Sequence, residues 1–283
     1  PPGTGTSLLA SRLPGILPEM TEAEALQAAT IKSISGLPVS SHNWRCRSFR
    51  APHHTASAVA LVGGGSNPTP GEISLAHHGV LFLDELPEYD RKVLEVLREP
   101  LESGRVMISR AARQAEFPAQ FQLIAAMNPC PCGYSGDPSG RCHCNIDQIE
   151  RYRRKISGPL LDRIDLHVEV PRLAFAELDG PRGECSAAVR ARVVRARQRQ
   201  LQRCGVLNSR LDNTQLQSAC SVESAAHRLL QRAMEQLRLS ARAYHRIQKV
   251  ARTIADLEDM DRIDVQHLSE AINYRRLDRV VTA

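Results

Sequence analysis

Short apolar runs mark the first part of the chain. One occupies residues 80–83 without a break, and the other occupies 121–126 with Gln122 as its one polar residue; such runs are typical of strands buried on both faces of a parallel sheet. We expect a further strand over 166–170, closed by Pro171, and irregular structure over 49–55. Because these runs alternate with helical stretches, the first part of the chain is predicted to be α/β.

A helical spacing of apolar residues appears between these runs and dominates the last third of the chain. Thr21 and Glu24 form a capping box that marks one helix start. The predicted helices cover residues 8–13, 22–32, 90–101, 186–203, 222–237, 241–257 and 265–277.

An alternating stretch over residues 104–117 predicts a β-hairpin that carries Arg105, Arg110 and Arg113. A polar, turn-rich segment over 178–183 is typical of a linker. We therefore expect an α/β core over 1–172, a linker and basic helix over 173–207, and a small all-helical domain over 208–283.

Charge and composition narrow the class of partner. The 283 residues carry a net charge of +6, which favours a polyanionic partner, while 4% aromatics argues against a platform that stacks single-stranded bases. No apolar run approaches the ~18 residues of a membrane span. The arginines of 186–203 fit a solvated helix face, the usual explanation, or a DNA contact.

Polar side chains follow the two apolar runs. Asp84 and Glu85 come directly after 80–83, at the strand end where open α/β sheets bind ligands. An aspartate there can hold the water shell of Mg²⁺, and Glu85 can polarise an attacking water. Asn128 follows the second run and can position a water or sense a phosphate. The alternative is a buried strand that ends in two solvated acids.

The chain start is nearly a P-loop, whose pattern is G-x-x-x-x-G-K-[ST]. Its glycines let backbone N–H groups turn toward phosphates ahead of a helix N-terminus. Thr6 occupies the lysine position, which predicts weak ATP binding and slow hydrolysis. The expected nucleotide-binding residues are Gly3, Thr4, Gly5, Thr6, Ser7 and Leu8, with Ser7 as a Mg²⁺ ligand. Without an initiator methionine, the chain is interpreted as a fragment whose first P-loop strand lies upstream.

Two further clusters suggest metal chemistry. A C-x-C, nine-residue, C-x-C arrangement suits structural Zn²⁺, with His143 as a substitute ligand, or else free or redox-active thiols. Its members are Cys130, Cys132, Cys142 and Cys144. The adjacent histidines at 53–54 and 77–78 are metal ligands or, as we favour, packing residues.

The order of these motifs resembles that of the magnesium-chelatase-like AAA+ family, in its competence-protein group, over essentially the whole chain. The resemblance is carried by Gly-Val-Leu-Phe-Leu-Asp-Glu-Leu-Pro-Glu at 79–88, Ala-Ala-Met-Asn-Pro-Cys-Pro-Cys-Gly at 125–133, and the stretches 157–165, 240–245 and 251–257. The Lon-protease-like N-terminal domain of that family would lie upstream.

The resemblance implies an AAA+ P-loop NTPase core, a parallel sheet flanked by helices, followed by a helical lid, with ATP and Mg²⁺ as cofactors. Asp84 matches the Walker B magnesium residue and Glu85 the catalytic base. Asn128 matches sensor 1. Arg163 matches an arginine finger that acts on a neighbouring subunit, and Arg242 matches sensor 2.

The resemblance also implies a bacterial cytoplasmic motor. It would assemble as a ring, by resemblance a hexamer, and drive branch migration of DNA in natural transformation. The hairpin arginines would line the pore and contact DNA. One alternative, suggested by Thr6, is a nucleotide- or DNA-binding remnant that does not hydrolyse ATP. The other is a magnesium-chelatase motor subunit, against which the cysteine cluster and the basic hairpin argue.

Overall fold

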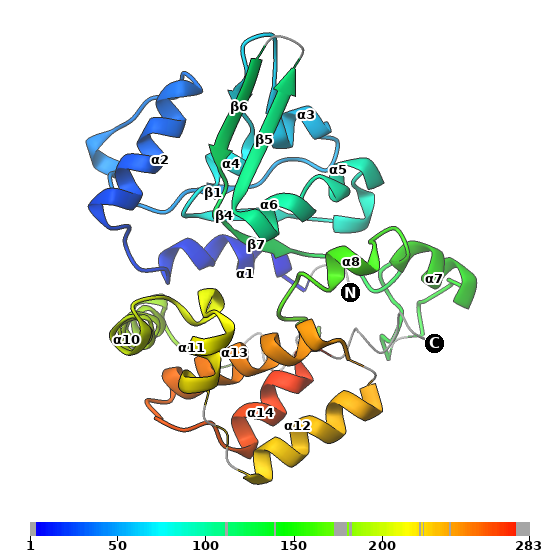
Figure 1. The fold of residues 1–283 in the computed structure, drawn as a ribbon. Helices are drawn as coiled ribbons and strands as arrows, with labels where there is room; N and C mark the ends of the chain where they lie inside the picture. The colour runs from blue at the N-terminus through cyan, green and yellow to red at the C-terminus, as the bar shows by residue number, and fades with distance from the viewer. Residues whose placement is uncertain are drawn as a thin grey trace. The chain divides into compact units, whose positions relative to one another are not determined.

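The chain divides into two compact units in a computed structural model (Figure 1). The first comprises Pro1–Arg163 and Val170–Arg182, and the second comprises Ile164–Glu169 and Gly183–Ala283. None of the described helices is long and apolar enough to cross a membrane. The residues described are 4–110, 113–138, 140–172, 180, 183–220, 222, 224–237 and 239–275.

A three-stranded parallel sheet with the order β1-β4-β7 forms the centre of the first unit. The middle strand, β4 (Val80–Leu83), is buried at all four residues, as the apolar run predicts. It pairs with β7 (Gln122–Ala125) on one side and with β1 (Phe49–Arg50) on the other. The expectation of irregular structure over 49–55 is therefore wrong at its first two residues, which gain backbone partners from β4.

The predicted strand over 166–170 is absent, and this segment has no regular structure. Its backbone makes a hydrogen bond outside the sheet: the N–H of His167 donates to the carbonyl of Tyr274 at 2.8 Å. The segment Ile164–Glu169 is thereby part of the second unit instead of the sheet.

Helices flank the sheet of the first unit (Figure 1). The capping box forms as predicted, since the Thr21 hydroxyl accepts from the N–H of Glu24 at 3.2 Å. The helix expected over 90–101 divides in two, because Pro100 lacks the N–H that a continuous helix would donate to Val96. The helices are α1 (Thr6–Arg12), α2 (Glu22–Ile34), α3 (Ala58–Val62), α4 (Glu72–Leu75), α5 (Arg91–Glu95), α6 (Arg98–Ser103), α7 (Ile146–Arg153) and α8 (Gly158–Leu161).

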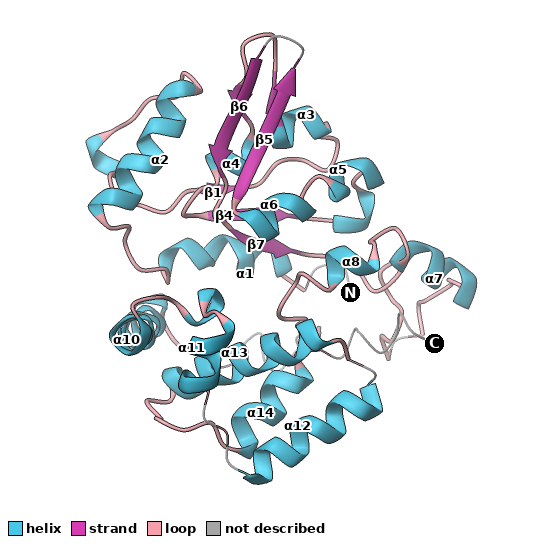
Figure 2. Cartoon of the chain, viewed as in Figure 1, coloured by secondary structure: helices cyan, strands magenta, loops and turns pink. Residues whose placement is uncertain are grey.

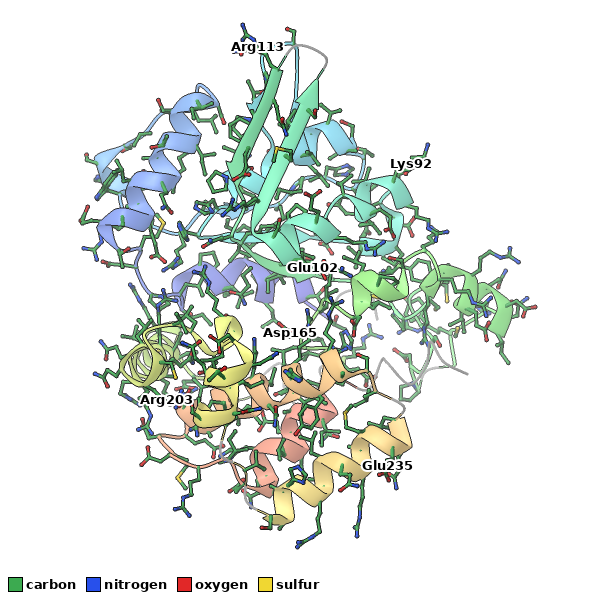
Figure 3. All side chains as sticks on the ribbon, viewed as in Figure 1. Lys92, Glu102, Arg113, Asp165, Arg203 and Glu235 are labelled. Carbon is green, nitrogen blue, oxygen red and sulfur yellow. The ribbon has the colours of Figure 1, made fainter. Side chains whose placement is uncertain are left out.

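The predicted hairpin projects away from this sheet (Figure 1). Its strands, β5 (Arg105–Arg110) and β6 (Arg113–Pro118), pair antiparallel. Arg113 lies at the far end of the hairpin (Figure 3). A smaller ladder joins β2 (Gly63–Gly64) to β3 (Thr69–Pro70).

Close backbone contact fixes the start of β4. A Cβ atom at Gly79 would lie 2.2 Å from the carbonyl oxygen of Ser48, which directly precedes β1. Only glycine allows this approach. The strand then packs into a core that includes the fully buried side chains of Leu61, Ile73, Leu94, Leu97 and Leu160.

The second unit is helical, and no named strand occurs among its described residues (Figure 2). Its apolar core surrounds a buried charge cluster. Asp256 accepts two hydrogen bonds from Arg203, at 2.7 and 2.6 Å, and lies 3.2 Å from the buried guanidinium of Arg252. The helices are α10 (Ser186–Cys204), α11 (Asn213–Ala219), α12 (Ser224–Leu237), α13 (Ala241–Leu257) and α14 (Val265–Asn273).

Candidate nucleotide site and cysteine cluster

Ser7 and Asp84 meet at the carboxyl edge of the sheet. Asp84 directly follows β4, and its Oδ2 accepts a hydrogen bond from the Ser7 hydroxyl at 2.5 Å. Its other oxygen, Oδ1, accepts from the backbone N–H of Glu85 at 2.9 Å. Two hard oxygen ligands therefore converge here, which is the donor chemistry that Mg²⁺ prefers.

The glycine turn before α1 brings Ser7 to this position. Gly5 has φ 79°, in the left-handed region, and α1 begins at the next residue, Thr6. Thr4 and Leu8 flank the same turn, whereas Gly3 lies outside the described residues. Thr6 has a short uncharged side chain, so this turn offers no ammonium group to a phosphate.

Glu85 turns sharply away from the strand. Its backbone lies in the left-handed region at φ 50°, a conformation that non-glycine residues adopt rarely and often at functional sites. The Glu85 side chain is 53% exposed, and its Oε2 lies 3.3 Å from Nδ1 of His54. Both residues line a pocket of about 290 Å³ together with Ala51, Pro52, His53, Phe82 and Asp84.

Asn128 follows β7 at the same edge, because Ala125 pairs with Leu83 and the N–H of Ala126 donates to the Leu83 carbonyl. The hydroxyl of the buried Tyr152 interacts with the Asn128 backbone, which favours its ionised form. Burial, with the nearby charge of Glu88, nevertheless raises the pKa of Tyr152 to about 12. Tyr152 therefore lies beside the backbone that carries Asn128.

Arg163 is held within its own unit. Its side chain is 8% exposed, its Nη2 lies 2.6 Å from Oε1 of Glu102, and its Nη1 donates to the carbonyl of Pro159 at 2.6 Å. Glu102 lies on α6 (Figure 3). Arg242 belongs to the second unit, near the start of α13, where the Ser240 hydroxyl caps the helix as predicted.

The four clustered cysteines converge on one point. The sulfur of Cys132 lies 3.4 Å from that of Cys130 and 3.7 Å from that of Cys142, and the sulfurs of Cys130 and Cys142 lie 3.9 Å apart. With Cys144 included, the four sulfurs lie within 4.8 Å of one another. Backbone N–H groups of Tyr134 and His143 lower the pKa of Cys132 to about 6. In Cys142 and Cys144 a backbone hydrogen bond is outweighed by burial and by the neighbouring thiols, which raise the pKa of both, that of Cys144 to about 11. The sulfur geometry, and not these opposite shifts, points to a metal site. This cluster can therefore hold a metal ion.

The predicted DNA-contacting arginines lie on the hairpin. Arg105 pairs with Glu116 at 3.0 Å, and Arg113 donates to Oδ1 of Asn67 at 2.8 Å. Arg110 ends β5, and its side chain lies outside the described ones. Among the histidine pairs, His77 is buried and accepts from the N–H of Gln120 at 3.0 Å, which agrees with packing.

Sequence patterns did not identify three residues that lie against predicted site residues. They are His54 beside Glu85, Glu102 beside Arg163, and Tyr152 beside Asn128. The sequence signal at His54 was ambiguous, since adjacent histidines usually serve packing. Glu102 and Tyr152 carry no local motif, and their contacts with Arg163 and Asn128 depend on the fold.

A serine after a glycine turn and an aspartate at the end of the central strand are the groups with which P-loop NTPases hold Mg²⁺ and phosphates. On a parallel sheet, and with a helical second unit, they define an AAA+ core followed by a helical lid. The chain belongs to the magnesium chelatase family: the family "Magnesium chelatase, subunit ChlI" matches residues 1–178, and its C-terminal counterpart matches 183–275.

Individual relatives refine this placement. The chain is 51% identical to competence protein ComM of Haemophilus influenzae, over 99% of this chain and 55% of that protein. It is 48% identical to protein YifB of Escherichia coli, over 99% of this chain and 56% of that protein. Magnesium-chelatase subunit ChlI of Cyanidium caldarium is 26% identical over 42% of this chain and 28% of that protein. The chain thus spans about half the length of the ComM and YifB relatives.

Proposed function

We propose that this chain is the ATP-driven motor of a ring-forming protein that moves along branched DNA. The observation that carries the proposal is the 2.5 Å contact between Ser7 and Asp84, with Glu85 next in the chain. The identity to ComM, a competence protein, favours DNA over a tetrapyrrole as the substrate. We infer that the process is branch migration during natural transformation, in the bacterial cytoplasm.

Each polar group at the sheet edge has a role in this proposal. Ser7 and Asp84 would hold the Mg²⁺ that accompanies ATP, and this ion neutralises charge on the phosphates. Glu85 accepts a proton from water as the water oxygen bonds to the γ-phosphorus and the bond to ADP breaks, which releases ADP and phosphate. Asn128 donates to the attacking water or the γ-phosphate. Arg163 stabilises the transferring group of a neighbouring subunit, so the ring, by family resemblance a hexamer, completes each site.

The hairpin is the proposed DNA contact. It projects from the core with Arg113 at its far end, and the chain has a net charge of +6. Its arginines would contact backbone phosphates, which fix position without reading sequence.

The cysteine cluster is proposed to hold structural Zn²⁺. Sulfurs of a tetrahedral site with Zn–S bonds of about 2.3 Å lie about 3.8 Å apart. The separations of 3.4 to 3.9 Å among the sulfurs of Cys130, Cys132 and Cys142 agree with that spacing, and Cys144 completes the cluster within 4.8 Å. A bound ion would brace the segment between Asn128 and α7.

Thr6 supports a second candidate function, a protein that binds nucleotide or DNA without turnover. Threonine lacks the ammonium group that reaches the β- and γ-phosphates in working P-loops. DNA binding that persists without ATP, together with absent hydrolysis, would favour this alternative.

The deciding experiment measures ATP hydrolysis by the purified protein with and without forked DNA. We compare the native protein, Thr6→Lys, and Glu85→Gln as the inactive control. DNA-stimulated hydrolysis that Glu85→Gln abolishes supports the motor. Absence of hydrolysis in both the native and Thr6→Lys proteins overturns the ATPase proposal. Stimulation by a tetrapyrrole-binding partner, and not by DNA, would indicate a chelatase motor.

A further inference from the structure

Arg163 is retracted into its own core. Its side chain is 8% exposed, and Glu102 and the Pro159 carbonyl hold the two terminal nitrogens of its guanidinium. The Nε atom is buried and has no hydrogen-bond partner among the described residues. A buried donor without an acceptor is unfavourable. This arrangement therefore satisfies the arginine only in part, and a phosphate that offers more oxygens can replace Glu102.

Glu102 lies at the foot of the hairpin. It is the last residue but one of α6 (Arg98–Ser103), and β5 begins at Arg105, three residues further on. Figure 3 shows Glu102 near this foot and Arg113 at the far end of the hairpin. A force on the base of the hairpin therefore acts on the chain within one helical turn of Glu102.

Hydrogen bonds leave little slack in this connection. The Ser103 hydroxyl donates to the carbonyl of Glu99 in α6 at 3.0 Å and accepts from the N–H of Arg105 in β5 at 3.2 Å. Gly104 lies between them with φ 69°, and its carbonyl accepts from the N–H of Ala119, directly after β6, at 2.8 Å. The end of α6 and both strands of the hairpin thus belong to one hydrogen-bonded network.

We infer that the pair of Arg163 and Glu102 is a latch that DNA opens through the hairpin. DNA that draws the hairpin arginines toward its phosphates shifts the end of α6, and Glu102 moves away from Arg163. The freed arginine then reaches the γ-phosphate on a neighbouring subunit. DNA and that phosphate both favour the open arrangement, so each strengthens the effect of the other. This inference rests on the proposed function and adds its regulation by DNA.

The kinetic test replaces Glu102 in whichever form, native or Thr6→Lys, hydrolyses ATP. An amide accepts a weaker hydrogen bond than a carboxylate, by roughly tenfold in the equilibrium constant. We expect Glu102→Gln to raise kcat without DNA at least fivefold and to leave kcat with saturating forked DNA within twofold of the parent. Glu99→Gln removes an exposed carboxylate of the same helix and should keep the parent's stimulation by DNA. A Glu102→Gln protein with the parent's DNA-free rate and full stimulation overturns the inference.

A second measurement does not need turnover. Phenylglyoxal modifies accessible guanidinium groups, and peptide mass spectrometry follows its reaction with Arg163 in the nucleotide-free protein. We expect Arg163 to react at least fivefold faster in Glu102→Gln than in the native protein, and faster in the native protein once forked DNA is bound. Arg47, whose side chain is also 8% exposed, is the internal reference and should not change. Equal rates at Arg163 with and without the Glu102 carboxylate overturn the latch.

The double variant Arg105→Ala/Arg113→Ala tests where the signal begins. At DNA concentrations that saturate this variant, DNA should no longer speed the modification of Arg163, and adding Glu102→Gln should restore fast modification. A response to DNA as large as that of the native protein contradicts a route through the hairpin. Failure of ATP hydrolysis alone rejects the proposed function and leaves the modification rates to decide on the latch.

Discussion

Arg163 and Glu102 form an ion pair within the first unit, with Nη2 of the arginine 2.6 Å from Oε1 of the glutamate. The guanidinium is nearly buried, and the Pro159 carbonyl also accepts from it. An arginine that stabilises a γ-phosphate on another subunit must exchange Glu102 for that phosphate. Ring assembly and release of this pair are therefore linked in the proposed mechanism.

We predict that Arg163→Ala lowers kcat for ATP about a thousandfold and that Arg163→Lys does not rescue it, because an ammonium lacks the planar two-donor geometry. Mixing Arg163→Ala with Glu85→Gln subunits should restore part of the activity, since each subunit then supplies the half-site that the other lacks. Steady-state ATPase assays of the mixtures measure this recovery. A mixture no more active than its components would show that Arg163 does not act in trans.

Thr6→Lys should tighten ATP binding. A hydrogen bond to a charged group contributes about 1.5–3 kcal/mol, which corresponds to a tenfold to hundredfold lower Kd. Titration with a fluorescent ATP analogue measures the change. Thr6→Met is the matched control, because it adds length without charge and should leave Kd near the native value. Equal affinities of all three proteins would show that position 6 does not contact the phosphates.

Removing two hairpin charges should weaken DNA binding without changing its sequence preference. The double variant Arg105→Ala/Arg113→Ala loses two phosphate contacts. A plot of the logarithm of the DNA-binding constant against the logarithm of salt concentration should therefore have a slope that is less negative by about 2. Fluorescence anisotropy over a salt series measures both quantities. The control Arg91→Ala/Lys92→Ala removes the same charge from α5 and should retain the native slope. Equal losses in the two double variants would point to net charge instead of the hairpin.

The cysteine cluster should bind about one Zn²⁺ per chain. Cys132→Ser is expected to lose the metal and to lower the melting temperature, because the ion joins the two ends of the loop between Cys132 and Cys142. Elemental analysis and thermal unfolding measure these effects, and Co²⁺ substitution should give intense thiolate charge-transfer bands. Cys46→Ser, an exposed cysteine outside the cluster, serves as the control. A native protein that is isolated without metal and takes up none would contradict the prediction.

The parts of this fold that the sequence predicted are those set by local pattern. The run at 80–83, the hairpin strands and the capping box at Thr21 each depend on residues close together in the chain, and all three are confirmed. The two-residue strand β1 was missed, because so short a segment has no periodicity and is a strand only through its pairing with β4.

Candidate site residues were likewise predictable where a local motif marks them and not where a contact depends on the fold. Asp84 and Ser7 were predicted from motifs, and the structure brings them into contact. Glu102 could not be predicted as the partner of Arg163, because nothing in its neighbourhood indicates where α6 ends relative to α8. The false strand at 166–170 has a related cause: its apolar alternation fits an edge strand as well as an extended segment against helices.

The assignment of Ile164–Glu169 to the second unit has a practical consequence for dissecting the protein. Asp165 accepts from Arg246 at 2.7 Å, and the N–H of His167 bonds to Tyr274, so this segment is part of the helical unit although it precedes the linker region. A fragment that begins at residue 183 would lack it and leave Arg246 without this carboxylate. On the ribosome, the segment is made before any of the helices that it joins, so its final contacts form only when synthesis of α14 is complete.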